Sequence, residues 1–204
     1  GEEDIVISKF NASGNAMLYS TYLGGNGDER PTSLVVNDAN ELYVLGSTNS
    51  TNFPVASGCY DVSNNGNFDL VVTKFNASGN AIAAGTYIGG SANDGRNGFF
   101  DEHTQAVTGD PIYFNYGDDV RGEIILDDLS NVYVASSTSS SNFPIVSGFQ
   151  SNYKDGGQDG VVLKLNSGLS KNSFHFLMFL LSLSLPSTGL KIWWASSFRS
   201  NVRA

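Results

Sequence analysis

Cysteine and histidine are nearly absent from this chain of 204 residues. The single cysteine, Cys59, cannot form an internal disulfide, and no histidine lies beside it to activate it as a nucleophile. The two histidines, His103 and His175, belong to no paired or HExxH metal-binding pattern. The sequence also has no GxSxG elbow and no phosphate-binding glycine loop. Paired carboxylates for glycoside hydrolysis stay open, because they can come from different loops, but nothing selects a pair.

Basic residues are scarce as well. The chain has 11 Lys and Arg against 20 Asp and Glu, which gives a net charge of −9. Because binding to phosphates needs clustered Lys and Arg, this balance argues against nucleic acid as a partner. Glycine, in contrast, is abundant at 23 residues, and Asn and Ser are frequent too. This composition is typical of many short strands joined by turns.

The chain repeats itself. The octapeptide KFNASGNA at 9–16 recurs at 74–81, within a longer match of DIVISKFNASGNA to DLVVTKFNASGNA at an offset of 65 residues. Other matches have an offset of 90, where ELYVLGST becomes NVYVASST and NFPVASG becomes NFPIVSG. DGVVLKL at 159–165 is a third copy of the opening strand, and the repeat pattern stops near Gly168. One unit is therefore 65 residues long, and an insertion of 25 residues between Gly90 and Gly117 lengthens it once.

Each unit contains four runs that predict strands. In the complete unit they are SLVVN (33–37), ELYVLGST (41–48), DLVVTKF (69–75) and AIAAGTYIG (81–89). Adjacent apolar residues in the first three predict burial on both faces of a sheet, while the more alternating fourth run is typical of an outer strand. NDAN and NASGN between the runs predict tight hairpins, because Asn bonds the local backbone and Gly supplies a positive φ.

A repeated four-stranded antiparallel unit predicts an all-β fold of radially stacked sheets, a partial β-propeller. We divide the chain into an outer half blade (1–32), a complete blade (33–90), an inserted loop (91–116), an incomplete blade (117–168) and a non-repeat tail (169–204). Closing a propeller takes about four to eight blades, so this chain is expected to be a fragment completed by neighbouring blades.

The pattern DxVVTKFNxSGN, TYLGG, ELYVxGST and NFP resembles the bacterial SBBP-type β-propeller repeat, over residues 4–90 and 117–168. The resemblance implies a secreted or cell-surface bacterial protein and a scaffold without a catalytic signature. It also implies that ligands use the central channel and the face that carries the long linkers. Because successive strands alternate in direction, the NDAN and NASGN hairpins should share one face, and the NFP linkers and the crossings between units should share the other.

The insertion supplies the candidate site residues on the linker face. Its aromatic and acidic side chains suit stacking on a sugar ring, and we name as ligand-binding candidates Phe99, Phe100, Asp101, Glu102, Tyr113 and Tyr116. Weak candidates for a Ca²⁺ site, without EF-hand spacing, are Asp94, Asp101, Asp110, Asp118 and Asp119. The alternative is a surface loop whose aromatics pack on the sheet edge. Asp28–Glu29 and Asp118–Asp119 stand before equivalent inner strands and are expected to be solvated turn carboxylates, or else to line the channel mouth.

The tail differs from everything before it. Residues 171–204 contain no acid and carry both tryptophans, and no outer strand follows the last blade. We weigh a frameshift, a membrane-associating segment and a divergent strand, and favour the frameshift. The apolar run 174–185 is shorter than the about 20 residues that span a membrane, so membrane contact is expected only if that run is genuine.

These observations favour a non-enzymatic propeller segment that acts as a binding, adhesion or structural scaffold for a carbohydrate or protein ligand, outside the bacterial cell. No cofactor is expected beyond the weak Ca²⁺ signal. The alternative is part of a carbohydrate-active enzyme, a lyase or glycosidase, with its site on the linker-face loops. A third is a purely structural spacer in a long surface protein. The chain begins with GEED, without Met or a signal peptide, and we read this end as truncated or processed.

Overall fold

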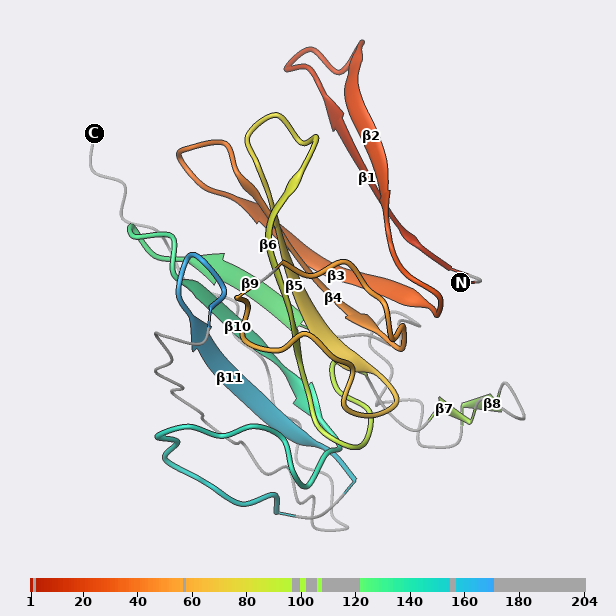
Figure 1. Cartoon of the computed structure of the whole chain (residues 1–204), viewed down its shortest axis with the longest axis vertical. Coiled ribbons are helices and arrows are strands. Elements are labelled where there is room, and N and C mark those ends of the chain that lie inside the picture. Colours follow the sequence, from red (N-terminus) through yellow and green to blue (C-terminus); the bar gives the residue numbers. More distant parts are fainter. Residues whose placement is uncertain are drawn as a thin grey trace, which may run out of the picture.

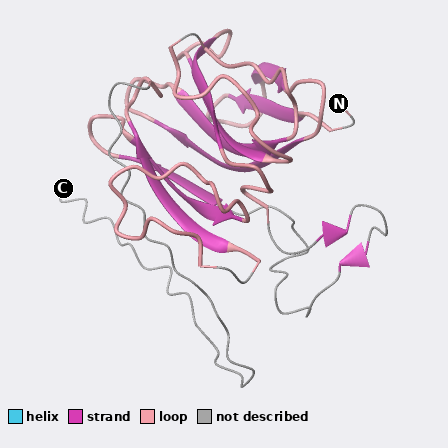
Figure 2. Ribbon diagram, turned by 60° about the horizontal axis from the view of Figure 1, so that its bottom comes forward, coloured by secondary structure: helices cyan, strands magenta, loops and turns pink. Residues whose placement is uncertain are grey.

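The computed structural model describes residues 1, 3–56, 58–96, 100–101, 106–107, 122–154 and 157–170. Every regular element in these ranges is a β-strand, which confirms the predicted all-β class (Figure 2). In the part of the chain that the structure describes, no helix is long and apolar enough to cross a membrane. The tail from residue 171 onward, including the apolar run 174–185, lies outside the described residues.

Three antiparallel sheets and one small hairpin make up the structure (Figure 1). The N-terminal sheet has the order β1-β2, the central sheet β3-β4-β5-β6 and the C-terminal sheet β11-β10-β9, and β7 pairs with β8. The strands are β1 Ile5–Phe10, β2 Met17–Leu23, β3 Glu29–Val36, β4 Leu42–Thr48, β5 Asp69–Phe75, β6 Ile82–Ile88, β7 Phe100–Asp101, β8 Ala106–Val107, β9 Gly122–Leu126, β10 Val132–Thr138 and β11 Asp159–Leu165. Each strand-like run of the complete unit thus forms a strand.

The internal repeat is reproduced in the register of the sheets. Thr48 of β4 lies opposite Asp69 of β5, and Thr138 of β10 lies opposite Asp159 of β11. The whole β4–β5 ladder therefore matches the β10–β11 ladder residue for residue, at an offset of 90. Equal side chains at equal positions produce the same pairing, because each strand must turn its apolar residues to the same side.

The repeated octapeptide is a strand end and its hairpin turn. Asn76 accepts hydrogen bonds from the N–H of Gly79 at its carbonyl oxygen (2.9 Å) and from the N–H of Asn80 at Oδ1 (3.1 Å). Gly79 has a φ of 70°, which glycine adopts without steric cost. Asn11 and Gly14 repeat these bonds and this φ in the first copy. The predicted hairpin is confirmed.

The divergent third copy keeps the same turn with different residues. Asn166 accepts from the N–H of Leu169 (3.0 Å) and, at Oδ1, from the N–H of Ser170 (3.0 Å). Leu169 takes the place of the glycine with a φ of 52°, and its side chain is fully buried. The structural repeat therefore continues through Ser170, two residues past the point at Gly168 where the sequence pattern stops.

Burial of the inner strands only partly follows the expectation. β4 and β5 are buried on both faces, as predicted. β3 was expected to be buried in the same way, but it alternates, and Leu34 and Val36 are exposed. The reason lies in the N-terminal sheet, whose two strands do not extend over this part of β3.

The outer strand β6 also departs from the expectation. It lies at the edge of its sheet, as predicted, yet it is buried from Ala84 to Ile88 rather than alternating. The linker that follows β4 covers it. The N–H of Ala56 donates to the carbonyl of Gly85 (3.4 Å), and the N–H of Tyr87 donates to the carbonyl of Asp61 (3.1 Å). Coverage by a segment distant in sequence is not visible in the pattern of a strand.

The central sheet is packed between the other two. One hydrophobic cluster joins it to the C-terminal sheet and includes Leu45 and Val134. A second cluster joins its opposite face to the N-terminal sheet and includes Ile5 and Val71. Sheets stacked face to face in chain order bring the same end of each sheet together, so their linkers and crossings meet.

The turn glycines provide a first test. Gly14→Ala places a side chain at positive φ in open space, so we expect a loss of about 1 kcal/mol in the free energy of unfolding. Gly79→Ala should cost clearly more, because the added Cβ would run into the ring of Tyr19. Urea unfolding of both variants measures the difference, and equal losses would contradict the contact between this hairpin and β2.

Candidate functional site

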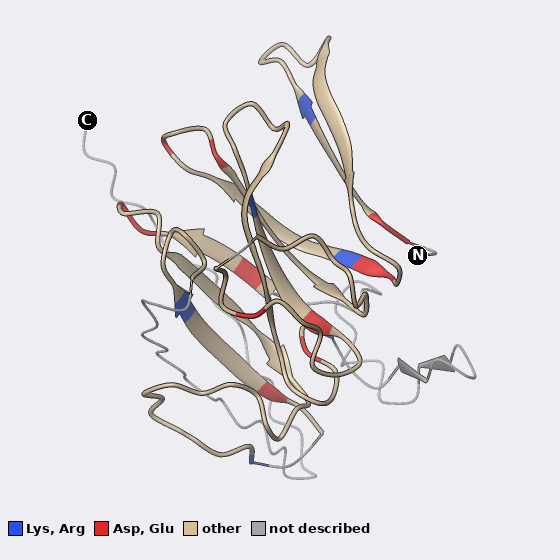
Figure 3. Ribbon diagram, viewed as in Figure 1, with Lys and Arg blue, Asp and Glu red and all other residues tan. Residues whose placement is uncertain are grey.

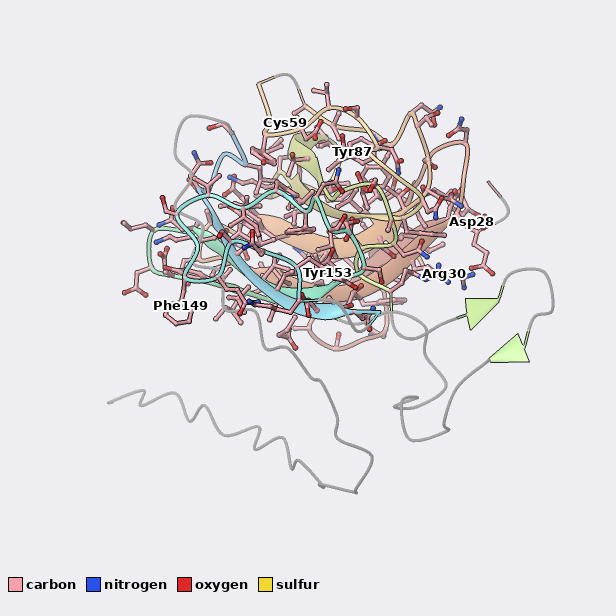
Figure 4. The ribbon with its side chains drawn as sticks, turned by 90° about the horizontal axis from the view of Figure 1, so that it is seen from below. Asp28, Arg30, Cys59, Tyr87, Phe149 and Tyr153 are labelled. Atoms are coloured by element: carbon pink, nitrogen blue, oxygen red, sulfur yellow. The ribbon has the colours of Figure 1, made fainter. Side chains whose placement is uncertain are left out.

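The crossings between sheets and the NFP linkers meet at one end of the structure, as predicted. We call the segment that leads from the outer strand of one sheet to the inner strand of the next a crossing. In the crossing after β2, the N–H of Asn26 donates to Oδ1 of Asn52 (2.7 Å) and the N–H of Asp28 donates to Oδ1 of Asn49 (2.6 Å), both in the linker after β4. The crossing after β6 does the same one unit later, from Ser91 to Oδ1 of Asn142 (2.8 Å). Figure 4 looks onto this end of the molecule, with Asp28 near its edge. We call it the linker face.

A buried acid holds each crossing in place. Glu29 accepts hydrogen bonds from the hydroxyls of Thr48 and Ser50, the latter at 2.5 Å, and from the N–H of Gly25 (2.9 Å). Its side chain is buried, so the expectation of a solvated turn carboxylate is wrong for Glu29. A buried carboxylate is costly unless donors surround it, and here three donors do so.

Asp94 is the counterpart of Glu29 in the next unit. It accepts hydrogen bonds from the hydroxyls of Thr138 and Ser140, the latter at 3.0 Å, and from the N–H of Gly90 (2.7 Å). The internal repeat at an offset of 90 predicts Asp118–Asp119 as the counterparts of Asp28–Glu29 instead, because that alignment places the insertion before the acid. The spacing GGxxx[DE], present at 24–29 and at 89–94, is the signal that would have found the pair. We call each such acid, with its Thr-x-Ser partners, a clasp.

The second clasp contains a pair of carboxyl groups. A Cβ added at Gly89 would run into both Oδ1 of Asp69 and Oδ2 of Asp94, so the two side chains approach each other across this glycine. Oδ2 of Asp69 accepts from the N–H of Asn65 (2.8 Å), whereas Oδ1 is buried and accepts no hydrogen bond from the described residues. Figure 3 shows such acidic positions where β3, β5 and β11 begin.

Burial controls the protonation of this pair. It raises the pKa of Asp69 from 3.8 to about 7, and the charge of Asp94 adds to the increase while the Asn65 hydrogen bonds oppose it. Burial likewise raises the pKa of Asp94 to about 6, against the lowering effect of the hydrogen bonds from Thr138, Gly90 and Ser140. A proton on Asp69 would remove the repulsion between the two carboxylates.

Tyr87 fixes the start of the linker beside the first clasp. Its hydroxyl donates to the carbonyl of Ser50 (2.9 Å) and accepts from the N–H of Phe53 (2.7 Å). Burial raises the pKa of Tyr87 to about 12, and the ring packs edge-on against Phe53. Figure 4 shows Tyr87 among the packed side chains beneath the linker. The linker face is therefore anchored at a fixed position.

A polar hollow of about 460 Å³ opens on the linker face. It is lined by Asn26, Gly27, Asn49, Thr51, Gly66, Asn67, Phe68 and Asn93. Oδ1 of Asn93 is buried and makes no hydrogen bond to any described residue. The guanidinium of Arg96 lies over the ring of Phe68, with Cζ of Arg96 4.2 Å from the centroid of that ring. Amide groups without an acid or base among the lining residues suit a neutral ligand rich in hydroxyl groups.

Most of the candidate residues of the insertion lie outside the residues that the structure describes. Phe99, Glu102, Tyr113 and Tyr116 lie outside the described residues, as do Asp110, Asp118 and Asp119. Phe100 and Asp101 form β7, of which only the backbone is described. Of the Ca²⁺ candidates, Asp94 alone has a described side chain. Where side chains are described, no three Asp, Glu, His or Cys residues gather as a metal site.

The clasps predict large effects of conservative substitutions. Thr48→Val removes a donor to the buried Glu29 while keeping the shape of the side chain, and we expect a loss of about 1.5–3 kcal/mol in unfolding free energy. Thr138→Val should cost a similar amount through Asp94. The control is Thr51→Val, whose hydroxyl bonds the exposed Asn26, and its effect in urea unfolding should be far smaller. Equal effects at positions 48 and 51 would refute the clasp.

The carboxyl pair predicts a pH dependence. Both folded-state pKa values lie above the unfolded value, so this contribution to stability is complete below about pH 4 and is lost as the pH rises to about 7. Asp69→Asn cannot ionise at position 69. The free energy of unfolding of the wild type should therefore fall, relative to this variant, by on the order of 2–4 kcal/mol between pH 4 and pH 8. Asp38→Asn, on an exposed hairpin, is the control, and parallel profiles of wild type and Asp69→Asn would contradict the pair.

Comparison with known proteins adds no relative. No family model matches the chain, and no curated protein matches it. The resemblance to the SBBP-type repeat therefore stays a prediction that rests on the residues of this sequence, and the functional argument depends on the geometry of the linker face.

Proposed function

We propose that this chain is a non-catalytic segment of a β-propeller, a scaffold outside the bacterial cell that binds a neutral saccharide on its linker face. The observation that carries the proposal is the recurrence of one clasp at the point where the crossing enters each successive sheet. Glu29 receives Thr48 and Ser50, and Asp94 receives their counterparts one unit later. Repetition of one contact in successive units is what stacking of equivalent blades produces.

The hollow on the linker face supports the binding role. Its lining combines four asparagine residues with Gly27 and Gly66, and the buried Oδ1 of Asn93 makes no hydrogen bond to a described residue. Saccharide hydroxyls both donate and accept hydrogen bonds, as amide groups do, so the two sets are complementary. A charged ligand would find no counter-charge among these lining residues.

The Asp69–Asp94 pair is the one feature that favours the enzymatic alternative, since its pKa values of about 7 and about 6 are those of a working acid and base. Both side chains are completely buried, however, and Asp94 is held by three hydrogen bonds within its clasp. A substrate would have to separate two sheets to reach them. The pair therefore fits a structural role better than a catalytic one.

Binding of the full chain to an array of neutral oligosaccharides, followed by calorimetry with the best binder, tests the proposal. Asn67→Ala and Asn93→Leu should each weaken binding by about tenfold, the effect of losing one or two hydrogen bonds. Asn80→Ala is the matched control, because Asn80 is exposed on a hairpin and does not line the hollow. Unchanged affinity in both hollow variants, or no binder in the array, would refute a saccharide site. Release of reducing sugar that Asp69→Asn abolishes would instead establish the enzyme.

A further inference from the structure

One side of the polar hollow on the linker face is built on the Asp69–Asp94 pair, although neither acid lines the hollow. Residues 66–68, which lead into β5, and Asn93 of the crossing after β6 form this side. Asp69 follows residue 68 directly in the chain, and Asp94 follows Asn93. The two buried acids therefore adjoin the residues that a bound molecule contacts.

Hydrogen bonds connect the pair to this wall at two points. The N–H of Asn65 donates to Oδ2 of Asp69 (2.8 Å), which holds the loop that precedes β5. The N–H of Asp94 donates to the carbonyl of Phe68 (2.7 Å), which joins the crossing to the same loop. Each acid thus holds one part of the wall, and the second bond spans the two parts.

The loop and the crossing are also in direct contact. A Cβ added at Gly66 would run into the carbonyl of Gly90, so no free space separates the two segments there. Closely packed segments do not absorb a displacement without shifting as units. A change in the spacing between Asp69 and Asp94 must therefore change the shape of the hollow.

The ionisable groups around Asp69 come from the neighbouring elements, and most of them are acids. They are Asp94 and Arg96 of the crossing after β6, Asp61 of the linker after β4, Glu29 at the start of β3 and Tyr87 of β6. Burial raises the pKa of Asp69 to about 7, and the charges of Asp94 and Asp61 add to the increase, while the Asn65 hydrogen bonds oppose it. Tyr87 stays protonated in this range, since burial raises its pKa to about 12. As the pH rises from about 5 to about 8, the pair becomes two buried carboxylates that repel each other.

We propose that the Asp69–Asp94 pair is a proton-dependent gate of the hollow, which binds its saccharide while the pair holds a proton and loses affinity when both carboxylates are ionised. Repulsion within the ionised pair separates the loop from the crossing, because each acid holds one of them. By linkage, saccharide binding near neutral pH takes up protons. The inference rests on the proposed saccharide site and adds the regulation of that site.

The first unit supplies a matched control. A Cβ added at Gly24 would run into both Oδ1 of Asp4 and Oε2 of Glu29, which are the counterparts of Asp69 and Asp94. Asp4 is exposed, however, so water surrounds its charge. Asp4→Asn therefore makes the same chemical change at the same position of the repeat without removing a buried charge.

Amide exchange of the full chain, followed by NMR without any saccharide, tests the gate itself. The protection factors of the N–H groups of Asn65 and Asp94 should fall by roughly tenfold between about pH 5 and about pH 8. In Asp69→Asn they should stay constant, because an amide does not ionise, and Asp4→Asn should behave like the wild type. A flat profile in the wild type, or the same fall in Asp69→Asn, would overturn the proposal. So would an equal fall at the N–H of Gly79 in the opposite hairpin, since the whole fold would then be loosening.

Calorimetry with the neutral oligosaccharide that binds best in the array tests the coupling to binding. The wild type should bind roughly tenfold more tightly at about pH 5 than at about pH 8. At about pH 7 the heat of binding should depend on the ionisation enthalpy of the buffer, which measures the uptake of protons. Asp69→Asn should bind equally at both pH values and take up no proton.

The outcomes separate this inference from the saccharide site on which it rests. An affinity of the wild type that does not change with pH would overturn the gate and leave the saccharide site intact. Loss of the pH dependence on addition of Ca²⁺ would overturn it too, because a cation rather than a proton would then neutralise the pair. If no oligosaccharide binds while the N–H groups of Asn65 and Asp94 still respond to pH, the saccharide site is refuted and the gate stands.

Discussion

The structure depends on carboxylates buried at the points where the crossings enter the central and the C-terminal sheet. Each clasp brings an acid from the start of an inner strand or crossing together with a Thr-x-Ser that follows the next strand. Taking such an acid out of water is unfavourable, so it is stable only where all its donors are in place. This requirement fixes how each crossing enters the sheet that follows it. It also brings the crossings and linkers together, and the polar hollow forms between them.

The faces of the inner strands follow from this stacking. Each inner strand has one face toward the preceding sheet and one toward the next, so burial depends on which neighbours are present. Leu34 and Ile124 occupy the same position in two units, yet only Ile124 is covered. The strand β3 was expected to be buried on both faces because its sequence is suited to it, and the neighbour rather than the strand decides the outcome.

Hairpins show how much local sequence alone can specify. Asn or Asp at the first position and a residue at positive φ three positions later produce the same turn in the four hairpins of the three sheets, at Asn11, Asn37, Asn76 and Asp127, and in the turn after β11 at Asn166. The bonds are within a few residues, so the sequence predicts them well. The positive-φ position holds glycine in two of these turns and Asn40, Ser130 and Leu169 in the others, and Leu169 alone among them is apolar and fully buried.

The sequence by itself determined the strands, their order, the hairpins and the alternation of hairpin and linker ends, because these follow from short periodicities and from local hydrogen bonds. Only the tertiary structure decided which acids are buried and that the linker covers β6. These features depend on residues that lie 19 to 46 positions apart in the sequence yet within hydrogen-bond distance in space. The desolvation of a carboxylate is a property of its surroundings, and those surroundings exist only after the sheets have stacked.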